Sequence, residues 1–161
     1  MTTTSTQQQI GLPPWFLHAQ TFERAGVMEV PGEKAHPTIL SFFTYTTLKG
    51  TRLALTDETA WCSAFMCAVM EQCGIKSTKS AAAKSWKTWG EGLAEPRLGC
   101  IVVSERIDPN NPAAAHVALW AGHVDHDRYA SLGGNQSNRV CTKPRPYADV
   151  IAYRWPIGVK L

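Results

Sequence analysis

The clearest pattern of apolar positions in the chain predicts a helix that begins near Cys62. Apolar residues recur there at helical spacing, i, i+3, i+4, i+7 and i+11, on one face; they are Cys62, Phe65, Met66, Val69 and Cys73. Asp57 and Thr59 offer N-caps before this segment, and Gly74 offers a C-terminal stop. We therefore expect a well-formed helix with Cys62 in its first turn.

Three shorter helices are expected on either side of this one. The first begins at Pro13-Pro14, where proline suits a helix start, and ends at Gly26. A second begins near Pro37, after a turn over residues 28–32, and the last covers roughly residues 81–89. The N-terminal half of the chain is thus predicted to be mainly helical.

After Gly99 the pattern changes to short apolar or alternating runs separated by turn-forming residues. The predicted strands are 101–103, 116–120, 129–132, 138–142 and 150–155. Helices followed by strands with short connections indicate an α+β fold, in which N-terminal helices pack on a C-terminal antiparallel sheet.

Length and composition fit one domain. The chain has 161 residues, 44% hydrophobic and 18% charged, which is enough apolar material for a core. We expect the Thr- and Gln-rich residues 1–12 to be a disordered tail and residues 13–161 to form a single domain. The net charge is +3 with scattered basic residues, which argues against nucleic-acid binding and is compatible with an anionic polymer as partner.

The sequence predicts neither a structural metal centre nor a membrane span. The five cysteines form no CxxC pair, and their odd number excludes a complete set of disulfides, so reduced thiols are expected. The start MTTTSTQQQ lacks the basic and apolar regions of a secretory signal, and no apolar run approaches membrane length. We expect a monomer without a cofactor that is synthesised in the cytoplasm.

Cys62 and His116 are the candidate catalytic pair. The free N–H groups and positive dipole of a helix N-terminus favour a thiolate, so Cys62 is predicted to be a nucleophile with a lowered pKa. His116 opens the apolar run 116–120 and is the candidate general base. Each also has a structural interpretation, Cys62 as a small buried apolar residue and His116 as a hydrogen-bonded residue at a strand edge.

A third residue is needed to orient the histidine. Asn135 follows Gly133-Gly134, and glycines let a backbone approach a neighbour closely. We expect Asn135 to accept the N–H of His116, with Gln136 as the alternative, because adjacent strand residues face opposite sides of a sheet. The run Gly-Gly-Asn is also common in turns.

A metal hydrolase is a weaker alternative. The loop over residues 122–128 contains His123, Asp125, His126 and Asp127. Its two histidines together with His116 would be the metal ligands. Short His/Asp clusters lack the fixed geometry of a zinc site, so a solvated hairpin tip is the preferred interpretation.

Several motifs, taken in order, carry a resemblance to a known family. They are Pro14-Trp15, Glu29-Val30-Pro31-Gly32, Asp57 to Phe65 (DETAWCSAF), Ser80 to Gly90 (SAAAKSWKTWG), Ile101-Val102-Val103, His116 to Trp120 (HVALW) and Leu132 to Ser137 (LGGNQS). In this combination the chain resembles the NlpC/P60 and CHAP group of cysteine hydrolases, and more narrowly a small branch found in phages and bacteria. The resemblance runs from about Pro13 to Trp155.

The resemblance implies a papain-like fold and a hydrolase that cleaves amide bonds of peptidoglycan. It would make Cys62 the nucleophile, His116 the base and Asn135 the polar third residue. The backbone N–H of Cys62 would contribute to the oxyanion hole. The strand that usually opens with Gly-Asp opens here with Gly99-Cys100, which we interpret as a structural change.

The candidate substrate-binding residues are Trp61, Ser63, Trp86 and Gln136. Many members of the family have Asp before the nucleophile, where it helps to hold a free amine of the stem peptide; here Trp61 stands there, and Asp57 or Glu58 is a candidate replacement. Trp61, Trp86 and Trp89 would line a groove for a sugar or peptide, although tryptophans at helical spacing more often belong to a core.

The leading hypothesis is a bacteriolytic peptidoglycan amidase or endopeptidase, similar to a phage endolysin, that acts in the periplasm or cell wall after release or delivery. One alternative is an antibacterial effector with the same chemistry and a cognate immunity protein. Another is a catalytically inactive module that binds the wall or belongs to a virion. The residues do not distinguish an N-acetylmuramoyl-L-alanine amidase from an endopeptidase.

Overall fold

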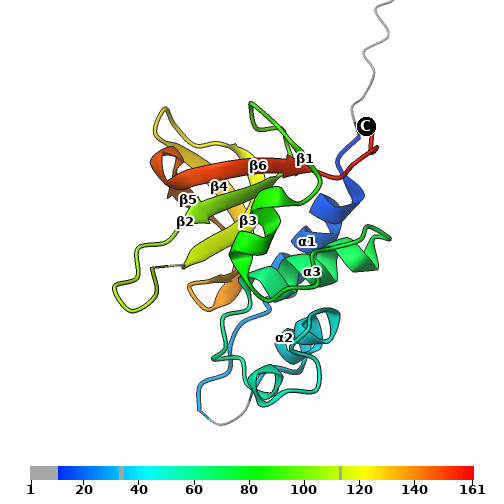
Figure 1. Ribbon diagram of the computed structural model, residues 1–161, viewed down its shortest axis with the longest axis vertical. Helices are drawn as coiled ribbons and strands as arrows, with labels where there is room; N and C mark the ends of the chain where they lie inside the picture. Colours follow the sequence, from blue (N-terminus) through cyan, green and yellow to red (C-terminus); the bar gives the residue numbers. More distant parts are fainter. Residues whose placement is uncertain (1–10, 33–34, 113) are drawn as a thin grey trace, which may run out of the picture.

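The computed structural model describes residues 11–32, 35–112 and 114–161. It has an α+β architecture in which helices α1 and α3 lie beside a six-stranded antiparallel sheet (Figure 1). This confirms the predicted class and the antiparallel sheet. Residues 1–10 of the expected disordered tail lie outside the described residues.

The three α-helices confirm the predicted ones. They are α1 (Pro14–Arg24), α2 (Pro37–Phe42) and α3 (Cys62–Gln72). Pro14 begins α1, and glycines with positive φ follow α1 and α3, at +69° for Gly26 and +75° for Gly74. Glycine adopts this left-handed conformation without strain, which is why both helices end there.

Four short 3-10 helices complete the helical part of the described chain. They are η1 (Phe43–Tyr45), η2 (Arg52–Leu55), η3 (Ala83–Thr88) and η4 (Tyr147–Asp149). The helix predicted at 81–89 is therefore the 3-10 helix η3 rather than an α-helix. In the described chain, no helix is long and apolar enough to cross a membrane.

Helix α3 is buried on all sides rather than on one face. Every residue from Cys62 to Met70 is buried. One side of α3 packs on strands β3 and β4, and α1, α2 and η1 cover much of the rest. A helix enclosed in this way is apolar all round, which explains why the single apolar stripe expected from the sequence was too narrow.

The sheet contains all five predicted strands. The strands are β1 (Glu91–Gly92), β2 (Ile101–Glu105), β3 (Ala115–His123), β4 (Arg128–Gln136), β5 (Arg139–Pro146) and β6 (Val150–Trp155). Their order is β1-β6-β2-β3-β4-β5, and every neighbouring pair is antiparallel. Cys100, directly before β2, is fully buried. The central strands β2 and β3 thus contribute buried residues to the core, and His116 lies near the beginning of β3.

A β-bulge interrupts the pairing of β4 with β5. Gly133 pairs with Cys141 and Gln136 pairs with Arg139, so Gly134 and Asn135 lie opposite a single residue, Val140. An extra residue in one strand shifts the alternation of its side chains between the two faces. The side chain of Gln136, the last residue of β4, therefore lies on the opposite face of the sheet from the one that uninterrupted alternation would give.

Candidate active site

Cys62 and His116 line the same cavity, which has a volume of about 310 Å³. The remaining lining residues are Arg106, Asn135, Ser137, Asn138 and Arg145. They come from the loop after β2, the turn between β4 and β5, and the end of β5. The structure thus brings the predicted nucleophile and base, which are far apart in the sequence, to one site.

The N-terminus of α3 is fixed closely against β4. A Cβ atom added to Gly134 would lie 2.7 Å from Phe65 Cβ and 2.7 Å from Trp61 Cζ3, so only glycine allows this approach. Trp61 is the N-cap of α3, and within the described chain no side chain caps this end of the helix. Asp57 and Thr59 are therefore not its caps. The first N–H groups of α3 are left without helical acceptors beside the thiol.

Asp57 has a different role from either one predicted for it. Its Oδ2 accepts hydrogen bonds from the backbone N–H groups of Val30 and His36, each at 3.1 Å, and its side chain is buried. Asp57 therefore holds the backbone at Val30 and at His36, and it is not free to bind a substrate amine.

Gln136 is the hydrogen-bond partner of His116. Gln136 Oε1 lies 3.0 Å from His116 Nε2. The amide group of Gln136 has a defined orientation, because its Nε2 donates to the carbonyl oxygens of Ser131 at 2.9 Å and Cys141 at 2.6 Å. Since Gln136 Oε1 can only accept, His116 Nε2 must carry the proton and Nδ1 keeps its lone pair. Nδ1 is thus available as a base.

The prediction that Asn135 orients His116 is wrong in this structure. Asn135 lines the cavity, but the bond to the imidazole comes from the next residue, Gln136. The bulge at Gly134 and Asn135 is the reason, because it moves Gln136 to the face that Ser131 and Gly133 occupy. Gln136 was the stated alternative, and its buried position also argues against direct substrate binding.

The thiol and the imidazole form a neutral pair in the free protein. Burial raises the pKa of the Cys62 thiol, although hydrogen bonds from the backbone of Val117 and Ser63 oppose this effect. Burial, reinforced by the charge of Arg145, lowers the pKa of His116 to about 3. The predicted lowered pKa of Cys62 is therefore wrong. Before any ligand binds, the site therefore contains a neutral thiol and a neutral imidazole rather than a preformed thiolate.

No hydrogen bond joins Cys62 to His116 among the interactions of the described residues. Both side chains nevertheless line the same cavity, and the thiol lies beside the backbone of Val117, which follows His116 in the chain. Catalytic hydrogen bonds are often long in a free enzyme and shorten when the substrate binds. The absence of a direct hydrogen bond is therefore compatible with a role for both side chains in one site.

Three of the predicted substrate-binding residues belong to the core. Trp61, Ser63 and Trp86 are each 0% exposed. Ser63 Oγ donates to the carbonyl of Ser80 at 2.6 Å and accepts the indole N–H of Trp86 at 2.8 Å. These residues attach the 80–86 segment to α3, so direct contact with a substrate is excluded by burial.

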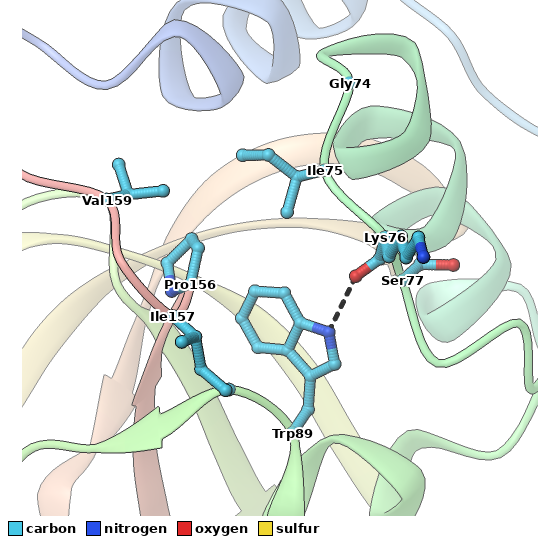
Figure 2. A pocket seen from close by; sticks show the side chains of 9 residues that line it. Gly74, Ile75, Lys76, Ser77, Trp89, Pro156, Ile157 and Val159 are labelled. Atoms are coloured by element: carbon cyan, nitrogen blue, oxygen red, sulfur yellow. Dashed lines mark hydrogen bonds between the residues drawn. The ribbon is translucent and has the colours of Figure 1, made fainter.

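Trp89 lies in another pocket, which has a volume of about 540 Å³ (Figure 2). There its indole ring lies near Ile157 and Pro156, and its N–H donates to the carbonyl of Lys76 at 2.9 Å. This pocket shares no residue with the cavity that contains Cys62. A tryptophan-lined groove at the candidate active site is therefore not present in the described structure.

Arg106 and Arg145 are site residues that the sequence analysis missed. Arg106 follows β2 and Arg145 lies near the end of β5, and both line the cavity with Cys62. Both guanidinium charges lower the pKa of the Cys62 thiol and of His116. The alternation of Lys143 and Arg145 in β5 was the available signal, since it predicts one basic face of a strand.

The turn between β4 and β5 contributes strained backbone to the cavity. Asn135, Ser137 and Asn138 have φ values of +56°, +52° and +60°, and all three line the cavity. This region is unfavourable for non-glycine residues, least so for asparagine. Such strain persists where the surrounding structure enforces it, as it often does at functional sites.

The alternative of a metal site receives no support. Within the described residues there is no group of three or more His, Cys, Asp or Glu side chains that would hold a metal ion. His123 Nδ1 interacts with the hydroxyl of Tyr147 at 2.5 Å, and His126 is exposed beside Asp127. All five cysteines are free thiols.

Comparison of the chain with protein-family models, curated proteins and solved structures finds no match. Its function is therefore inferred from the geometry of the candidate active site.

Proposed function

We propose that the protein is a cysteine-dependent amide hydrolase that acts on peptidoglycan, with Cys62 as nucleophile, His116 as base and Gln136 as the residue that orients His116. The observation that carries this proposal is the defined tautomer of His116, which leaves Nδ1 as an acceptor in the cavity that also contains Cys62. Histidine needs such an orienting partner to act as a base toward a nucleophile.

The order of elements supports a papain-like fold as part of the same proposal. The cysteine begins a buried helix, and the histidine and the amide follow on adjacent antiparallel strands β3 and β4. The close approach of Gly134 to α3 holds the helix start against these strands. In this arrangement, one rigid sheet positions both partners of the thiol.

The reaction proceeds in two halves. As Cys62 Sγ attacks the carbonyl carbon of the substrate, His116 Nδ1 accepts the thiol proton and then delivers it to the leaving nitrogen, so an S–C bond forms and the C–N bond breaks. Water then attacks the thioester, giving up a proton through His116 to Cys62 Sγ, and releases a carboxylic acid. The net change is hydrolysis of one amide to an acid and an amine.

The uncapped N-terminus of α3 is suited to stabilise the tetrahedral intermediate. The backbone N–H of Cys62 lies in the first turn of α3, and within the described residues no side chain makes a capping hydrogen bond at this end of the helix. An oxyanion that forms beside Sγ would accept such N–H groups and benefit from the helix dipole. Loss of a single oxyanion-hole donor typically slows turnover by about a hundred- to a thousandfold.

Digestion of purified peptidoglycan tests the proposal. The wild-type protein should release new amino groups, and mass analysis of the fragments should identify one cleaved amide bond. Cys62→Ala removes the nucleophile and should reduce this release on the order of a thousandfold or more. Equal release by the two proteins, or cleavage of glycosidic bonds alone, would contradict the proposal.

A further inference from the structure

Two pockets meet at Cys62, and their walls differ in polarity. One is the cavity of about 310 Å³ with His116, Arg145 and the polar residues of the β4–β5 turn. The other has a volume of about 410 Å³ and is lined by Ala60, Ala81, Ala82, Ala83, Ala114 and Ala115, together with Cys62, Lys84, Arg106, Asp108 and Asn111. A substrate that crosses Cys62 thus has one half beside His116, Arg145 and amide groups. The other half lies beside a wall of alanines edged by charged and polar residues.

The two arginines beside Cys62 lack an acidic partner within the described structure. Its ion pairs are His126 with Asp127 and Arg128 with Asp125, so no described carboxylate lies within 4.0 Å of the Arg106 or Arg145 guanidinium. Arg145 Nε makes one long hydrogen bond, 3.3 Å, to Gln136 Oε1. The other donors of Arg145 are available to a ligand in the cavity, and guanidinium groups bind carboxylates in a bidentate manner.

The position of His116 indicates in which direction a substrate lies across Cys62. In the proposed reaction His116 transfers a proton to the leaving nitrogen, so the amine half of the substrate must lie on the His116 side of Cys62. That side is the cavity that contains Arg145, and Arg106 lies at the border because it lines both pockets. The acyl half then lies in the alanine-lined pocket.

We propose that the amine half of the substrate carries a carboxylate and that Arg145, with Arg106, binds it on the His116 side of Cys62. This inference rests on the proposed function and adds the charge and the direction of the substrate. Asp57, which the sequence suggested as a site for a free amine, is buried in backbone contacts. The described cavity thus selects an anionic group near the scissile bond.

The test compares native peptidoglycan with peptidoglycan whose carboxylates have been converted to carboxamides with a carbodiimide and ammonium. On the amidated polymer, wild-type kcat/KM should fall about ten- to a hundredfold, mainly because KM rises. A fall of this size is expected from the loss of one charge-assisted hydrogen bond. Arg145→Gln should show a similar loss on native peptidoglycan and little further loss on the amidated polymer. Arg145→Lys, which keeps the charge, should recover part of the loss, and Arg106→Gln is measured in the same way.

Arg128→Gln is the matched control for net charge, because Arg128 pairs with Asp125 on an exposed hairpin. It should behave as wild type on both polymers. Thermal unfolding of each variant shows whether the fold is retained.

The outcomes separate the two proposals. If wild type and Cys62→Ala release equal amounts of amine from native peptidoglycan, the proposed function fails. If release depends on Cys62 but wild type cleaves both polymers equally, the function stands and the carboxylate inference is overturned. The carboxylate inference would also be overturned if the losses from Arg145→Gln and from amidation multiply when they are combined. Independent effects of this kind mean that Arg145 and the substrate carboxylate do not interact.

Discussion

The carboxylate of Glu29 accepts the indole N–H of Trp61 at 2.8 Å, and Trp61 directly precedes Cys62. The backbone N–H of Glu29 donates to the carbonyl of Asn138 at 2.8 Å, in the turn between β4 and β5. Glu29 therefore links the two segments that flank the cavity, the start of α3 and the strained turn. The segment Glu29-Val30-Pro31-Gly32, which the sequence presented as a turn and as part of a family motif, therefore has a physical role in positioning the site.

Removal of the Glu29 carboxylate should destabilise the protein. Trp61 is 0% exposed, so Glu29→Ala leaves a buried N–H without an acceptor, which costs about 1–3 kcal/mol. Glu29→Gln keeps an acceptor oxygen and should stay within about 1 kcal/mol of wild type. Urea unfolding of the three proteins measures the difference. Equal stabilities of the Ala and Gln variants would show that the Trp61 bond contributes nothing.

Gln136 and Asn135 should differ in their effect on turnover. Gln136→Ala removes the acceptor that fixes the His116 tautomer, so we expect kcat to fall roughly ten- to a thousandfold with little change in KM. Asn135→Gly suits the φ of +56° at that position and leaves the His116 bond intact, so its kcat should fall much less. Steady-state kinetics on peptidoglycan decide between them. A crippled Asn135→Gly with a nearly normal Gln136→Ala would contradict the orienting role of Gln136.

The buried neutral His116 predicts a specific loss of stability in acid. The pKa of His116 is lowered from 6.5 to about 3, so between these values the unfolded chain binds a proton that the folded protein excludes. The free energy of unfolding should therefore fall as the pH falls from 6.5 toward 3, by up to about 5 kcal/mol at about 1.4 kcal/mol per pKa unit. His116→Gln removes this contribution. Parallel pH profiles of unfolding for wild type and His116→Gln would show that His116 does not titrate in this way.

Alkylation reports the state of the Cys62 thiol. Because burial raises its pKa above the ordinary value of 9.0, Cys62 should react slowly with iodoacetamide near neutral pH and faster as the solution becomes alkaline. Mass spectrometry of timed digests gives the rate at each cysteine, and Cys62→Ala identifies the relevant peptide. Rapid labelling of Cys62 at pH 6–7 would instead support the preformed thiolate that its helix position suggested.

Much of the architecture was predictable because it depends on local patterns. Apolar spacing and the punctuating glycines predicted α1 and α3, and alternating runs predicted the five longer strands. The position of His116 at the entrance of β3 followed from the apolar run after it. These features depend on residues near one another in the sequence, so the sequence of this one protein was sufficient to predict them.

The finer features of the site depend on long-range packing. The choice between Asn135 and Gln136 rests on a bulge opposite Val140. Gly133-Gly134 is typical of a bulge or a close approach, but it does not specify at which residue the alternation of side chains shifts. The burial of Trp61 depends on Glu29 and on the close approach of Gly134. The meeting of Arg106 with Arg145 depends on two elements that are far apart in the sequence.

The most direct test of the central claim is turnover of peptidoglycan by Cys62→Ala, His116→Ala and the double variant. A nucleophile and its base act as one unit, so each single variant should lose activity on the order of a thousandfold or more, and the double variant should be little worse than either one. Circular dichroism on each variant confirms the fold. Near wild-type turnover by Cys62→Ala, or losses that multiply in the double variant, would contradict a catalytic pair formed by Cys62 and His116.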